Sequence, residues 1–294
     1  MVVKIVIVTD KQYYMDGYLK ENLDILKQKL VKDDWFFIII ISGSNRVRVG
    51  KSTIAQQISY YLDDTYDFQS LIFNSEKLAD TMMKIGKGKV GHIDEGKEGF
   101  DSKRALESLQ KDLMDFLSQA GQLNQFIILV VPEFFDLNKS IATSQSICLI
   151  NCYCNPKNLF ERGYFQFFNI DHKNKLYYYG KKQGNNYLCV KPNFIGRFTN
   201  YQILDRTKYN KIKMQELEFL KERQEKRREE VKYINKLRQQ RAILIQELYN
   251  MGKDQYEIAN IINGHQSEIS IILKRLEADN NNNNPQIEQV NLKK

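Results

Sequence analysis

A short stretch near the start of the chain has the residue types and the spacing needed to hold a nucleotide triphosphate. Residues 43–53 read Gly-Ser-Asn-Arg-Val-Arg-Val-Gly-Lys-Ser-Thr. Glycine lets the backbone curl around phosphates, a lysine reaches the β- and γ-phosphates, and a Ser or Thr hydroxyl can ligate magnesium. The sequence therefore predicts a phosphate-binding loop (P-loop) that takes ATP and Mg²⁺. The residues expected to contact this cofactor are Gly43, Asn45, Arg48, Val49, Gly50, Lys51, Ser52 and Thr53.

The segments that flank the loop supply the strand and the helix that such a loop requires. Phe36–Ser42 is a continuous apolar run, typical of a strand buried on both faces, and Ile54–Leu62 has helical spacing. The loop departs from the usual pattern at Asn45, which stands where the first glycine is expected. Since Asn tolerates the left-handed conformation better than other residues with a side chain, we expect the loop to keep its shape.

Adjacent carboxylates follow another predicted strand, Val90–Ile93. Asp94 is suited to hold the magnesium shell, and Glu95 to polarise the attacking water as a general base. Ligands of α/β sheets bind at the carboxyl ends of the strands, so we expect the pair and the loop to share one site. The predicted catalytic residues are Lys51, Asp94 and Glu95, and the predicted magnesium ligands are Ser52 and Asp94.

Other polar residues near these elements are weaker candidates. The pattern around His92 favours a packed core histidine over a catalyst. Glu133 follows the predicted strand Phe126–Val131, where many ATPases place a sensor of the γ-phosphate, but the preceding Pro132 is unusual there.

The order of elements predicts an α/β fold. Strand-like and helix-like segments alternate over residues 1–155, which implies a parallel sheet with helices on both faces. Beyond Pro156, the aromatic-rich runs Leu159–Ile170, Lys175–Gly180 and Tyr187–Val190 predict a β-meander. The expected divisions are an ATPase domain over 1–204 with the meander at 156–204, a basic helical connector over 205–236, a helix-turn-helix over 237–278 and a disordered Asn-rich tail over 279–294.

Residues 241–276 resemble the helix-turn-helix units of transcription regulators and recombinases. We expect Gly252 to end the first helix, Asp254 to cap the second, Asn263-Gly264 to form the turn and Ser267 to cap the third. The expected apolar positions are Leu244, Leu248, Met251, Ile258, Ala259, Ile262, Ile269, Ile272 and Leu276. The third helix of such a unit enters the major groove by its first turn. The residues expected to contact duplex DNA are Gln266, Ser267, Ser270, Ile271 and Lys274.

Charge and hydropathy bear on the partners. The net charge is +8, and the stretch from Asp205 to Arg241 holds 13 Lys and Arg against 7 Asp and Glu, which favours an anionic partner. No apolar run approaches the roughly 18–20 residues of a membrane span, and the first residues lack the pattern of a signal peptide. The expected compartment is therefore the cytoplasm.

The first part of the chain, about residues 16–200, resembles the zonula occludens toxin-like P-loop ATPases, relatives of the FtsK and HerA DNA pumps. The resemblance rests on Val47–Thr53, on Asp94-Glu95, on the element ending at Pro132 and on Arg162-Gly163. It implies a RecA-like core, magnesium-dependent ATP hydrolysis and homo-oligomers on DNA, in a family common in viruses and mobile elements.

The function that these features predict is ATP-driven handling of DNA, such as packaging, segregation or translocation. A nucleotide or nucleoside kinase is an alternative. Glu95, which directly follows Asp94, argues against it, because kinases usually have no catalytic Glu after this Asp. A second alternative is a non-hydrolysing, ATP-dependent DNA-binding switch. For residues 241–276, a three-helix bundle that contacts protein rather than DNA also stays open.

Overall fold

The structure is a computed structural model that describes residues 5–8, 11–32, 36–43, 48–94, 102–119, 123–155, 158 and 161–282. Asn45 and Glu95 lie outside these described residues. The chain divides into two compact units, Met1–Phe219 and Leu220–Lys294, which we describe one by one. Helix α6 (Arg206–Asn250) begins in the first unit and continues into the second.

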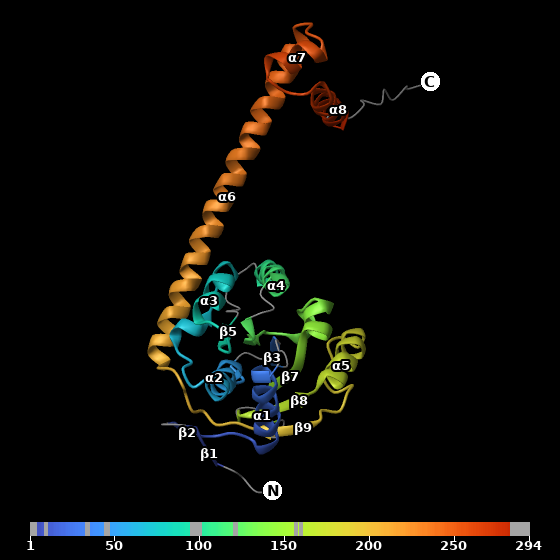
Figure 1. Ribbon diagram of the computed structural model, residues 1–294. Coiled ribbons are helices and arrows are strands. Elements are labelled where there is room, and N and C mark those ends of the chain that lie inside the picture. The colour runs from blue at the N-terminus through green and yellow to red at the C-terminus, as the bar shows by residue number, and fades with distance from the viewer. Residues whose placement is uncertain are drawn as a thin grey trace, which may run out of the picture. The chain divides into compact units, whose positions relative to one another are not determined.

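A seven-stranded sheet with the order β4-β5-β6-β3-β7-β8-β9 forms the centre of the first unit (Figure 1). Strands β4, β5, β6, β3 and β7 are parallel to one another, β8 is antiparallel to β7, and β9 is antiparallel to β8. The bounds are β3 (Phe37–Gly43), β4 (Leu71–Ile72), β5 (Val90–Asp94), β6 (Phe126–Val130), β7 (Ser146–Tyr153), β8 (Tyr164–Phe168) and β9 (Phe194–Arg197). Strands β1 (Ile5–Val8) and β2 (Lys11–Tyr14) form a separate antiparallel pair. The predicted α/β class is confirmed.

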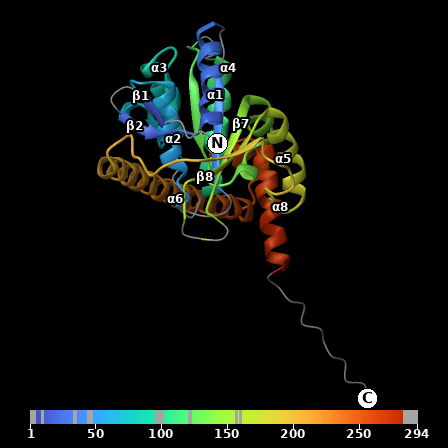
Figure 2. The ribbon, with the colours of Figure 1, turned by 90° about the horizontal axis from the view of Figure 1, so that it is seen from below.

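Helices cover both faces of this sheet, as predicted (Figure 1). Helices α1 (Gly17–Lys32) and α2 (Lys51–Leu62) pack on one face, which Figure 2 shows from their side. On the other face lie α3 (Leu78–Ile85), α4 (Ser102–Gln119) and α5 (Ile170–Lys182). Alternate β3 residues enter opposite cores, Ile39 and Ile41 on the α2 side and Ile38 and Ile40 on the α4 side. This explains why the strand is apolar at nearly every position.

The register of the sheet brings the loop strand and the acidic strand to the same edge. Strand β6 lies between β3 and β5, and its Val130 pairs with Ile41 on one side and with Asp94 on the other. The loop begins at Gly43, just beyond that level. The two predicted motifs therefore meet at the carboxyl ends of parallel strands, where ligands of such sheets bind.

The predicted β-meander is wrong in its middle. Residues Lys175–Gly180 belong to helix α5, whose first turn is capped by the Asn169 side chain accepting from the His172 backbone N–H at 3.0 Å. Aromatic residues favour strands in general, but here the buried positions 173, 176, 177 and 180 follow a helical period. Tyr187–Val190 forms turns, so β8 and β9 extend the main sheet as its antiparallel edge.

The predicted boundary between connector and helix-turn-helix is also absent, because α6 is one continuous helix of 45 residues. Two shorter helices follow it in the second unit, α7 (Gln255–Ile261) and α8 (Gln266–Asn282). Residues 225–230 of α6 are exposed at every position. Helix α8 extends into the predicted tail, whose residues 283–294 lie outside the described ones.

A glycine in α5 provides a test of this packing. Ala normally stabilises a helix interior relative to Gly. At Gly180, however, a Cβ would lie 2.6 Å from the Phe135 ring and 2.8 Å from the Asn186 carbonyl oxygen. We expect Gly180→Ala to lower the free energy of unfolding by about 1–3 kcal/mol, measured by urea denaturation. Gly17→Ala is the control, since a Cβ at Gly17 meets nothing within 4 Å. Equal stability of the two variants would contradict the α5 packing.

Candidate nucleotide and DNA sites

The described end of the loop enters α2 through left-handed backbone. Gly50 is the residue that precedes the helix, with φ 97°. A Cβ at Gly50 would lie 2.8 Å from the Phe198 ring, so both its conformation and its surroundings require glycine. Arg48 is left-handed as well, with φ 63°, whereas Asn45, for which the sequence predicts this conformation, lies outside the described residues. Val49 between them is buried.

The side chain of Lys51 runs back over the start of the loop. A Cβ built on Gly43 would lie 3.4 Å from the Lys51 Nζ and 3.3 Å from its Cδ. Burial raises the pKa of the Cys152 thiol to about 12, and the nearby Lys51 ammonium opposes this rise. Cys152 pairs with Gly43 across the sheet, so the two observations place the Lys51 side chain at the same point. Lys51 thus lies over the carboxyl end of β3, where the phosphates of a nucleotide would bind.

Asp94 ends β5 as a buried carboxylate. Burial acts to raise its pKa, but the Lys213 ammonium opposes this most strongly, and the pKa lies below its ordinary value. Hydrogen bonds from the hydroxyls of Tyr209 and Ser52 act in the same direction. The carboxyl is therefore ionised at neutral pH, and the two predicted magnesium ligands, Ser52 and Asp94, lie together.

Residues from the first turns of α6 complete this cluster. The Tyr209 hydroxyl donates to Asp94 Oδ2, and Lys213 Nζ lies 3.5 Å from Asp94 Oδ1. Tyr209 and Lys213 are one helical turn apart, so they lie on the same side of α6. Sequence reasoning missed both residues, because the contact joins positions far apart in the chain and neither residue belongs to a motif.

The segment before α6 lies across α2. Gln57 Nε2 donates to the carbonyl oxygens of Thr199 and Tyr201, each at 2.9 Å. Gln202 Nε2 donates to the hydroxyl of Thr53 at 3.2 Å. The first two turns of α2 are thus covered by chain that follows the sheet, and Thr53 contacts this segment.

The chemistry of these donors fits magnesium. Magnesium binds through oxygen, keeps several waters, and takes one or two carboxylates together with substrate phosphates. A Ser52 hydroxyl beside an ionised Asp94 supplies this set. Among the described residues there is no cluster of three or more His, Cys, Asp or Glu.

His92 is a core residue, as predicted. Its ring is fully buried, and Nδ1 lies 2.6 Å from the Tyr66 hydroxyl. Burial lowers the pKa of His92 to about 4, so the ring is neutral at neutral pH. A histidine in this state packs beside Asp94 without adding charge.

Glu133 is tied to the loop strand through a tyrosine. The Tyr187 hydroxyl donates to Glu133 Oε1, lies 2.9 Å from the Ser42 hydroxyl and accepts from the Phe134 N–H at 3.1 Å. Burial raises the pKa of the Glu133 carboxyl. Ser42 is the residue before Gly43, so this hydrogen-bonded group supports the end of β3 from the face opposite α2.

In the second unit, the end of α6 packs with α7 and α8 around a small core of Ile245, Ile258, Ala259, Ile269 and Leu273. Asp254 and Glu257 form a capping box at the start of α7, and Gly252 ends α6 with φ 82°, both as expected. Asn263 takes the left-handed position after α7, and the Gly264 N–H reaches the Ala259 carbonyl at 2.8 Å.

Some of the apolar positions predicted for the second unit are not buried in its core. Leu244 and Met251 are exposed, because the face of α6 that packs inward is centred on Ile245 and Met251 follows the helix end. In α8, Leu273 is buried, whereas Leu276 is only half-buried. An ion pair between Arg241 and Glu268, at 2.9 and 3.1 Å, links α6 to α8.

The start of α8 presents the residues expected to contact DNA. Gln266, Ser267, Ile271 and Lys274 are exposed, and Ser270 is half-buried. Helix α8 begins at Gln266, and the His265 carbonyl accepts its first hydrogen bonds, so the predicted cap at Ser267 is wrong by two residues.

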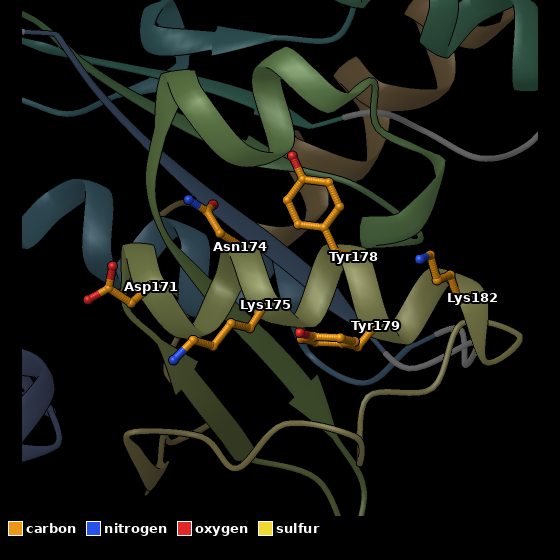
Figure 3. Close-up of a pocket in the computed structure, with 6 residues that line it drawn as sticks. All are labelled: Asp171, Asn174, Lys175, Tyr178, Tyr179 and Lys182. Carbon is orange, nitrogen blue, oxygen red and sulfur yellow. The ribbon is translucent and has the colours of Figure 1, made fainter.

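A separate surface lies on the solvent face of α5. A shallow cavity of about 540 Å³ is lined by Asp171, Asn174, Lys175, Tyr178, Tyr179 and Lys182 (Figure 3). All of these residues come from one helix, and none belongs to the loop, to β5 or to α6. This surface is therefore distinct from the candidate nucleotide site.

Comparison with known proteins finds no match, so a functional conclusion has to come from the geometry of the site. No family model, no curated protein and no solved structure matches the chain. Among the described helices, none has the length and apolarity that crossing a membrane takes.

The support of β3 by Tyr187 can be tested by removing one hydroxyl. We expect Tyr187→Phe to lower the free energy of unfolding by about 1–3 kcal/mol, because the buried Glu133 carboxyl loses its side-chain donor. Urea denaturation of the purified protein measures this. Tyr178→Phe, at a half-exposed ring on α5, is the matched control and should change stability by less than about 0.5 kcal/mol. Equal effects of the two substitutions would show that the Tyr187 hydroxyl supports nothing.

Proposed function

We propose that the first unit binds and hydrolyses ATP with magnesium. The observation that carries this proposal is the meeting of three groups at one sheet edge: Lys51 over Gly43, and Ser52 beside the ionised Asp94. An unrelated Gly-Lys-Ser-Thr sequence would not be expected to place its lysine over the start of the loop and its serine beside a carboxylate on another strand.

Each group has a role in this proposal. The ammonium of Lys51 and the backbone N–H groups at the start of α2 bind the phosphates. Ser52 and Asp94 hold magnesium, which neutralises charge on the β- and γ-phosphates when bound. Glu95, the residue after Asp94, accepts a proton from the attacking water, a role assigned from its position in the sequence.

We also propose that the second unit binds duplex DNA. In support, α8 exposes polar and apolar side chains at its first turns, next to a capped α7 and a compact core. The exposed middle of α6 adds positive charge, which favours phosphate contacts. Together with the resemblance to FtsK- and HerA-related ATPases, this supports a homo-oligomeric ATPase of the cytoplasm that packages, segregates or translocates DNA.

A second candidate function is an ATP-dependent DNA-binding switch that does not move DNA. The contact of Tyr209 and Lys213 with Asp94 favours it, because the helix that reaches the second unit also touches the candidate magnesium ligand.

The ATPase proposal predicts separable effects of two substitutions. Lys51→Ala removes the cation that neutralises the phosphates, so ATP binding should be lost. Glu95→Gln should leave binding intact and slow hydrolysis by about 10²–10⁴-fold, the usual contribution of a positioned general base. Calorimetry measures binding and phosphate release measures turnover. Lys84→Ala, at an exposed lysine of α3, is the control and should behave as wild type. Wild-type turnover of Glu95→Gln would exclude Glu95 as the base.

The DNA proposal predicts different effects at neighbouring positions of α8. Lys274→Ala should weaken binding of the full chain to all duplexes alike and reduce the log–log salt slope by about 0.9. Gln266→Ala should instead change which sequences are selected from a random duplex pool. Lys253→Ala removes the same charge outside α8 and serves as control for the lysine effect. If the chain has no affinity for duplex DNA at low salt, the second unit is a protein-contact module.

A further inference from the structure

The first turns of α6 meet the oxygens that the proposed magnesium site needs. Asp94 Oδ2 accepts from the Tyr209 hydroxyl, and Asp94 Oδ1 lies 3.5 Å from Lys213 Nζ. The Tyr209 hydroxyl also interacts with the Ser52 side chain. Both predicted metal ligands are therefore engaged by residues of one helix.

These contacts supply what a cation would supply. An ionised, buried carboxylate is stable only with an opposite charge and hydrogen-bond donors near it. Lys213 provides the charge and Tyr209 the donor. A divalent cation bound at the same carboxylate would repel the Lys213 ammonium, because like charges a few ångströms apart repel in a partly buried site. Bound magnesium would therefore compete with Lys213 for Asp94.

Other contacts also hold this helical segment on the first unit. Lys77 pairs with Glu216 at 2.6 Å, where the lysine side chain is 56% exposed and the glutamate 21%. The Tyr209 ring packs at 65° to the Phe73 ring within the core on the α2 side, and Lys208 Nζ lies 4.4 Å from the centre of the Phe68 ring. The polar contacts with Asp94 differ from these, because they are the ones that a cation at this carboxylate would replace.

We infer that the first turns of α6 are an intrasteric gate on the nucleotide site, in which Tyr209 and Lys213 hold Asp94 until magnesium and nucleotide displace them. This inference rests on the proposed ATP site. Displacement frees residues 206–219 from Asp94, and α6 continues from there without a break into the second unit. By linkage, a ligand that binds better when the start of α6 is released raises the affinity for magnesium with nucleotide. Magnesium with nucleotide raises the affinity for that ligand by the same factor.

The test compares two conservative variants with a charge-matched control. Affinity for a fluorescent, non-hydrolysable ATP analogue is measured in the full chain with Mg²⁺ and with EDTA. Lys213→Met should raise the affinity about tenfold with Mg²⁺ and not with EDTA, because magnesium no longer competes with the lysine. Tyr209→Phe should change it in the same direction by less. Lys211→Met, at an exposed residue of the same helix, should change neither affinity.

Wild-type protein gives a second readout that needs no substitution. Amide hydrogen exchange over residues 206–219 should become faster with the analogue and Mg²⁺, and stay unchanged with the analogue and EDTA. A weaker Mg²⁺-dependent affinity in Lys213→Met, or unchanged exchange in wild type that binds the analogue, would overturn the gate alone. If wild type and variants bind no nucleotide in either buffer, the proposed ATP site fails and the gate with it.

Discussion

A charge buried at the end of a strand must be neutralised, and the neighbourhood of Asp94 is arranged around that need. Removing a carboxylate from water is costly unless a counter-charge and donors replace the water. Here Ser52 comes from α2, and Tyr209 and Lys213 come from α6. A single side chain of β5 thereby joins the helix after the loop, the sheet and the start of the helix that leads to the second unit.

The same need explains how a structural contact and a chemical site can share one residue. In the proposed gate, a bound magnesium ion would replace the α6 donors Tyr209 and Lys213, while Ser52 would stay as a ligand. The helix contact would then lower the affinity for the metal by the free energy that it contributes to holding α6. Such competition would join nucleotide binding to a helix position without a dedicated signalling element.

Much of the first unit could be predicted from the sequence, because its elements carry strong local signals. The buried run of β3, the helical spacing of α2 and the carboxylate at the end of β5 each follow a pattern that neighbouring residues alone determine. Helix α5 was misread because its aromatic residues favour strands, while its inward face was fixed by packing. The contact of Lys213 with Asp94 left no signal, since it joins distant segments. In the second unit the caps were predictable, but the phase of α6 depended on tertiary contacts at Ile245.

We propose that Asp94 makes the candidate nucleotide site depend on magnesium. Calorimetric titration of ATP into wild type and Asp94→Asn, with Mg²⁺ and with EDTA, measures this dependence. We expect wild type to bind ATP more tightly with Mg²⁺, and Asp94→Asn to bind it equally in both buffers. An Asp94→Asn protein that retains the full magnesium dependence of wild type would rule out this role of Asp94.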